Sequence, residues 1–160
     1  SRGGVAMIYK AITVANYIIE YSNKNMKPVS NLKLQKLLYY VQAAFLVEFS
    51  RPAFSNDIRA WKYGPVVESV YHMFKIYAND SIKHCNNDIT SDIISCEDDE
   101  KLIKSVIDSY VDYSPIEIML KTHQEAPWID SNELEKGSII GNDAIKEFYS
   151  KNRDLIYGNK

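Results

Sequence analysis

The stretch SNLKLQKLLYYVQAAFLVEF, residues 30–49, decides the fold of this chain. Apolar residues recur in it three and four positions apart, which is the pattern of a helix with an apolar stripe. The stripe consists of Leu34, Leu37, Leu38, Val41 and Phe45. Most of the positions between 39 and 47 outside the stripe are apolar as well, so almost no polar face remains. The sequence therefore predicts a central helix surrounded by the rest of the domain, with Ser30 or Asn31 as its N-cap.

Shorter patterns on both sides of this segment predict five more helices. They cover, in outline, residues 7–21, 65–78, 97–110, 114–123 and 142–149. Pro65 stands at a plausible first helical position, and the acidic run 97–100 suits the positive end of a helix dipole. Ser114 and Glu117 form a capping box around Pro115, the sharpest local signal in the chain. Asn142 or Asp143 is expected to begin the last helix.

Two segments are candidates for β-structure. Residues 54–61 alternate loosely between apolar and polar side chains, which predicts a short strand. Residues 81–96 fit a second short strand and an irregular excursion equally well. The fold class is therefore mainly α, a single compact domain of about six helices with room for a short two-stranded β element.

The domain boundaries follow from the same patterns. We expect residues 7–152 to form the helical domain and residues 153–160 to be a polar tail. Residues 1–6, ahead of Met7, read as a remnant of expression cloning and are left out of the fold.

Composition excludes several classes of protein. The chain has 160 residues, of which 46% are hydrophobic, enough for one core, and a formal net charge of -2 gives no general attraction to nucleic acid or anionic membrane. The longest apolar run, 37–49, is too short for the roughly 20 residues that span a bilayer. Two cysteines and no secretory signal favour a reducing compartment, so we expect a cytoplasmic protein that does not enter a membrane.

The sequence offers little for catalysis. Cys85 and Cys96 have His72, His84 and His123 as candidate partners, but no spacing typical of a zinc site occurs. The glycines form neither of the common phosphate-binding loops. We therefore predict a protein that is not an enzyme and that holds no metal and no cofactor.

A DNA-binding regulator is the alternative function. Lys24, Lys27, Lys33 and Lys36 lie around the start of the central helix, where a helix-turn-helix protein contacts phosphates. This alternative uses the Lys33 and Lys36 face of the helix. Arginine is absent from the patch, and the simpler interpretation is that the two lysines keep one helix face hydrated.

Four segments in one order carry a resemblance to a known family. They are SNLKLQKLLYY at 30–40, AWKYGPVV at 60–67, HQEAPW at 123–128 and GSII at 137–140. In this order and spacing they resemble the SocA-like antitoxin family, also called the Panacea domain. The sequence departs from the family in one place, because Ile140-Gly141-Asn142 replaces the serine or threonine cap of the last helix.

The resemblance implies a protein associated with a phage or mobile element and often encoded beside a toxin. Such a protein neutralises its cognate toxin by binding, and some relatives are linked to proteases as adaptors. The partners implied are thus a toxin protein and, for the adaptor role, a protease.

Candidate partner-binding residues gather around two loops of the chain. They are Trp61, Tyr63, Gly64, Pro65, Tyr71, His123 and Trp128. Aromatic rings with a polar edge dominate protein interfaces, and we expect Tyr63, Tyr71 and the loop residue Trp128 to border one apolar groove. The structural alternatives are that Trp61 is a core anchor and that His123 only satisfies the end of its helix. Twelve tyrosines exceed what a core needs, so some are expected on the binding face.

Overall fold

A computed structural model describes residues 7–86 and 92–159 of the chain. Within these ranges the fold has seven α-helices, two short 3-10 helices and one two-stranded sheet, which confirms the mainly α class. The elements are α1 (Ala11–Lys24), α2 (Asn31–Phe49), β1 (Arg59–Trp61), β2 (Gly64–Val66), α3 (Glu68–Phe74), η1 (Lys75–Tyr77), α4 (Glu97–Ser109), α5 (Pro115–Thr122), α6 (Ala126–Leu134), α7 (Asn142–Ser150) and η2 (Arg153–Tyr157).

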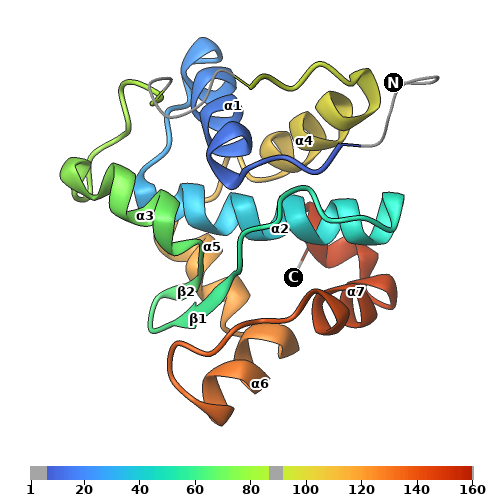
Figure 1. The fold of residues 1–160 in the computed structure, drawn as a ribbon. Helices are drawn as coiled ribbons and strands as arrows, with labels where there is room; N and C mark the ends of the chain where they lie inside the picture. Colours follow the sequence, from blue (N-terminus) through green and yellow to red (C-terminus); the bar gives the residue numbers. More distant parts are fainter. Residues whose placement is uncertain (1–6, 87–91, 160) are drawn as a thin grey trace.

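Helix α2 is the centre of the domain, as the sequence predicts. It crosses the middle of the molecule between α1 and α4 on one side and α5, α6 and α7 on the other (Figure 1). Leu34, Leu38 and Phe45 are fully buried, because neighbours cover every side of the helix. Ser30 is the N-cap, and its hydroxyl accepts a hydrogen bond from the backbone N–H of Lys33 at 3.2 Å. The apolar α2 thus organises the core on all its faces.

The hairpin β1–β2 corrects one prediction. Pro65 does not begin a helix, since residues 64–66 pair antiparallel with 59–61 and α3 begins only at Glu68. The predicted strand is confirmed for its last three residues. The hairpin is held to α2 because the side-chain oxygen of Gln35 accepts a bond from the backbone N–H of Val67 at 2.9 Å. Strand pairing and the hydrogen bond from Val67 to Gln35 thus place Pro65 in a strand, although proline is common at the first position of a helix.

Local signals in the second half of the chain are largely confirmed. Both bonds of the capping box are present, at 2.9 and 3.1 Å between Ser114 and Glu117. Helix α4 begins at its acidic run, and α7 begins at Asn142 without a side-chain cap from Gly141. Helix α6 was not predicted, and Trp128 lies in it rather than in a loop.

The chain end also differs from the prediction. Residues 153–157 form η2, and Ile156 is fully buried, so this segment packs against the domain and is not a polar tail. For residues 81–96 the sequence left a strand and an irregular segment as alternatives. Ser81 forms an isolated β-bridge with Ser30, and residues 82–86 and 92–96 form no strand. Residues 87–91 lie outside the described residues. None of the described helices is both long and apolar enough to pass through a bilayer.

Candidate functional site

A pocket of about 790 Å³ opens beside the hairpin. Its walls come from the start of α2, from β1, β2 and the turn between them, from the region of α3 and η1, and from α5. The lining residues are Asn31, Leu32, Gln35, Lys36, Trp61, Lys62, Tyr63, Gly64, Val66, Tyr71, Lys75, Ala78, Asn79, Ile116 and Met119. Its volume is in the range of ~300–1,000 Å³ that is usual for ligand-binding pockets.

Four of the seven predicted contact residues line this pocket. They are Trp61, Tyr63, Gly64 and Tyr71. The rings of Trp61 and Tyr71 meet edge to face, with centroids 5.1 Å apart. Tyr63 stands in the hairpin turn and is 58% exposed, so its ring is available to a partner. Tyr63 and Tyr71 thus line the same pocket, and their role in binding a partner stays a prediction.

The other three predicted residues lie behind the pocket wall. Trp128 is absent from the lining, and its indole N–H donates to the backbone carbonyl of Trp61 at 2.9 Å. Its ring stacks on His123 at a centroid distance of 4.0 Å. Pro65 is buried, and its carbonyl accepts a bond from Lys36. Trp128 thus holds the hairpin from α6 with His123, at the end of α5, stacked on it, and Pro65 lies within the hairpin itself.

Gly64 has a steric reason to be glycine. Its φ of +103° lies in the region that side-chain-bearing residues rarely adopt. A Cβ at this position would lie 2.6 Å from Cε of Lys36 and 2.9 Å from Oγ1 of Thr122. The hairpin therefore approaches α2 and α5 as closely as only glycine allows.

Lys36 lies at the closed end of the pocket, where it is only 2% exposed. Its ammonium donates to the carbonyl of Pro65 at 3.0 Å, and burial lowers the pKa of this amine to about 7. Lys33 is also buried, its ammonium donates to the carbonyl of Tyr113 at 2.6 Å, and burial lowers its pKa. These contacts contradict the DNA-binding face predicted on Lys33 and Lys36, because both lysines are buried and their amines donate to backbone carbonyls. The same contacts contradict the simpler interpretation, that Lys33 and Lys36 keep one face of the helix hydrated.

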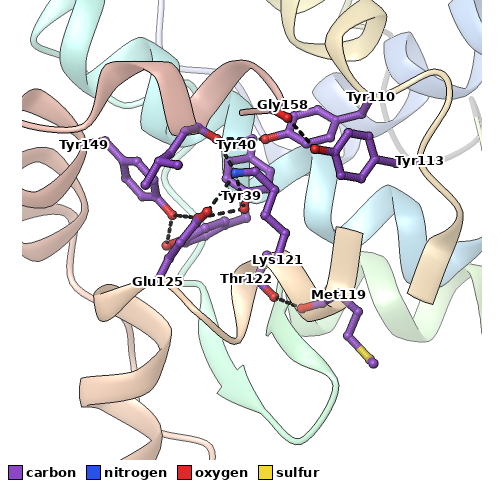
Figure 2. Close-up of polar contacts among 11 residues, drawn as sticks. Tyr39, Tyr40, Tyr110, Tyr113, Met119, Lys121, Thr122, Glu125, Tyr149 and Gly158 are labelled. Carbon is purple, nitrogen blue, oxygen red and sulfur yellow. Dashed lines mark hydrogen bonds and ion pairs between the residues drawn. The ribbon is translucent and has the colours of Figure 1, made fainter. Parts of the chain in front are cut away.

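A buried polar network connects side chains of α2, α5 and α7 with Glu125 (Figure 2). The carboxylate of Glu125 accepts bonds from the hydroxyls of Tyr40 and Tyr149, at 2.7 and 2.5 Å, and from the ammonium of Lys121 at 2.7 Å. The hydroxyl of Tyr39 lies 2.9 Å from that of Tyr149. Burial raises the pKa of each of these tyrosines well above its usual value. The network joins α2, α5 and α7, so these three tyrosines stabilise the fold. They are not among the tyrosines that could lie on a binding face.

No pattern in the sequence predicted this network. Glu125 belongs to the segment HQEAPW, and Lys121 lies two residues before that segment. The signal available in the sequence was their spacing of four residues, which suits an ion pair near a helix end. Their burial, at 4% exposure for Lys121 and 3% for Glu125, depends on the tertiary packing of Tyr40 and Tyr149 around them.

The thiols were the other candidates for chemistry. Sγ of Cys85 donates to a carboxylate oxygen of Glu20 at 3.2 Å. Across residues 7–86 and 92–159, no group of three or more His, Cys, Asp or Glu side chains is arranged to hold a metal ion.

The chain belongs to the SocA-like antitoxins that carry a Panacea domain. The family model described as "Antitoxin SocA-like, Panacea domain" matches residues 34–129, more than half of the chain, including the hairpin and most of the pocket wall. A particular relative is "Antitoxin SocA" of Caulobacter vibrioides (strain NA1000 / CB15N), which is 41% identical over 85 residues. This match covers 53% of the chain and 44% of the relative, so the chain spans less than half the length of that protein. No solved structure matches the chain.

Proposed function

We propose that this domain is an antitoxin module that neutralises a cognate toxin by binding it directly, at the pocket and the hairpin turn beside it. One observation carries the proposal: the segment that matches the antitoxin family, 34–129, is the segment that builds most of this pocket. The name of the Caulobacter relative supports the same function.

The surface around the pocket has the composition of a protein interface. Tyr63 and Ile116 line it and are 58% and 54% exposed, and Leu120 follows one helical turn later at 49%. Large side chains of this kind lose much water-accessible surface on binding and supply most of the energy of an interface. Trp61 and Tyr71 add a fixed aromatic wall that loses little conformational freedom.

The action proposed is stoichiometric binding in the cytoplasm, without catalysis. The setting is a phage or mobile element that encodes the toxin beside this protein. Neutralisation by occlusion leaves the toxin intact, whereas delivery to a protease, the adaptor role, lowers its amount. Toxin levels in hosts with and without the major cytoplasmic proteases separate these two forms.

The test is rescue of growth combined with co-purification. The product of the reading frame adjacent to this gene is expressed with the domain, and we expect growth to be restored and the two proteins to purify together. The double variant Tyr63→Ala/Ile116→Ala should lose both effects. The matched control Met26→Ala/Leu134→Ala removes two side chains that are each 85% exposed and that do not line the pocket, and it should retain both effects. Loss of rescue in the control, or full rescue by the pocket variant, contradicts the proposed site.

A further inference from the structure

The pocket is positively charged as well as apolar. Its described lining includes three lysines, Lys36, Lys62 and Lys75, and no aspartate or glutamate. Lys62 and Lys75 are exposed at the rim, on the hairpin turn and at the end of α3. The chain as a whole has a net charge of -2, so this local excess of positive charge is not a reflection of composition.

Between the lysines the pocket presents apolar surface. Val66 and Met119 contribute at its buried side, and Trp61, Tyr71 and Ile116 at its wall. A complementary ligand therefore carries negative charges separated by apolar groups. Electrostatic complementarity of this kind selects partners and speeds their association.

We propose that the occupant of this pocket is an acidic amphipathic segment of the toxin, with carboxylates on the three lysines and apolar side chains between them. This inference rests on the proposed function and deepens it by naming the chemistry of the partner.

Lys36 is the anchor of this arrangement. An ammonium has three N–H donors, and the bond that the described part of the chain provides for it is the one to the carbonyl of Pro65. The described residues form no salt bridge to it, in contrast to Lys121, which is equally buried and is paired with Glu125. A carboxylate entering from the pocket would supply the missing counter-charge. Burial and the charge of Lys36 lower the pKa of His123, so its imidazole favours the neutral form beside this amine.

The number and spread of the lysines favour an internal acidic segment over a chain terminus. Lys36, Lys62 and Lys75 come from three different parts of the fold, namely α2, the hairpin turn and the 3-10 helix after α3. A terminal carboxylate provides one negative charge and would leave the remaining lysines unpaired. A segment with several acidic side chains can pair with all of them.

Labelled model peptides test this chemistry without depending on the toxin. The probe is a peptide with alternating Glu and Leu and an amidated C-terminus, and its counterparts replace Glu by Gln or by Lys. We expect the acidic peptide to bind about tenfold more tightly than the Gln peptide at low salt, and the difference to shrink as salt is added. Equal binding of the two, or binding that requires a free C-terminal carboxylate, would overturn the proposal.

Variants place the interaction on the pocket. Lys62→Gln/Lys75→Gln should weaken binding of the acidic peptide and of the toxin by about tenfold, whereas the exposed pair Lys101→Gln/Lys146→Gln, which does not line the pocket, should not change it. Lys36→Met should weaken binding, whereas Lys33→Met, a buried lysine on the same helix that does not line the pocket, should leave it unchanged. Circular dichroism confirms that each variant is folded. A toxin that is neutralised equally by all variants refutes the acidic-segment inference alone, and a domain that neutralises no toxin refutes the proposed function.

Discussion

Replacing Lys36 by methionine should make the unliganded domain more stable. Lys36 is 2% exposed, and burial lowers the pKa of its amine from 10.5 to about 7. Each pKa unit corresponds to about 1.4 kcal/mol, so the folded state at pH 7 carries a cost of about 4 kcal/mol from this one group. Methionine has a similar length and no charge, and it removes that cost.

Part of this gain is lost again. The carbonyl of Pro65 accepts its hydrogen bond from Lys36, and leaving a buried carbonyl without a donor costs about 1–3 kcal/mol. The net expectation for Lys36→Met is a free energy of unfolding about 1–3 kcal/mol higher than that of the wild type at pH 7.

The pH dependence gives a sharper signature. Because the pKa of Lys36 is lower in the folded state than in the unfolded chain, the unfolded chain binds more protons between pH 7 and 10.5. Stability therefore rises with pH in that window, by about 2 kcal/mol from pH 7 to 9 for this group. The lowered pKa of His123 keeps its ring neutral over this range, and Lys33 contributes equally to wild type and variant.

Urea denaturation of the two proteins at pH 7 and pH 9 measures both effects. The reasoning predicts that Lys36→Met is the more stable protein at pH 7 and that its advantage shrinks at pH 9. A variant that is several kcal/mol less stable, or an advantage that does not depend on pH, would show that the amine is charged and well paired in the folded state.

Three further substitutions test other parts of the structure. Gly64→Ala should lower stability by about 2–4 kcal/mol, seen as a lower Tm, because of the positive φ and the 2.6 Å approach to Lys36; a Tm within error of the wild type would contradict that geometry. Glu125→Gln should lower the free energy of unfolding, measured by urea denaturation, by about 3 kcal/mol because Lys121 is left without its buried counter-charge. The double variant Lys121→Met/Glu125→Leu should recover part of this loss, and a Glu125→Gln variant as stable as the wild type would refute the pairing. Ser114→Ala should lower the free energy of unfolding by about 1 kcal/mol through loss of the capping box. An unchanged Tm would show that the cap does not stabilise the fold.

Local signals predicted much of the fold. The apolar stripe of α2 implied a buried central helix, and the capping box at Ser114 marked the start of α5 to the residue. Helix α6 escaped because its sequence, APWIDSNEL, has no one-sided apolar stripe. Its position depends on a tertiary contact, the bond from Trp128 to the backbone of Trp61. Ile156 likewise gives no periodic signal, since it is a single apolar anchor in a polar stretch.

The candidate site was only partly predictable for a related reason. The aromatic residues on the hairpin could be proposed from their type and from the turn beside them. The burial of Lys36 could not, because lysine is almost never fully buried and the pattern of α2 allowed a hydrated face. What buries it is the close approach of Gly64, which is a property of the assembled fold.

The central claim is that this antitoxin-family domain acts by direct binding at the pocket beside its hairpin. Isothermal titration calorimetry of the purified toxin against the wild-type domain and against Tyr63→Ala/Ile116→Ala tests it most directly. The account predicts saturable binding by the wild type and an affinity about tenfold lower for the variant. The absence of binding by the wild type, or equal affinity of the two proteins, would contradict it.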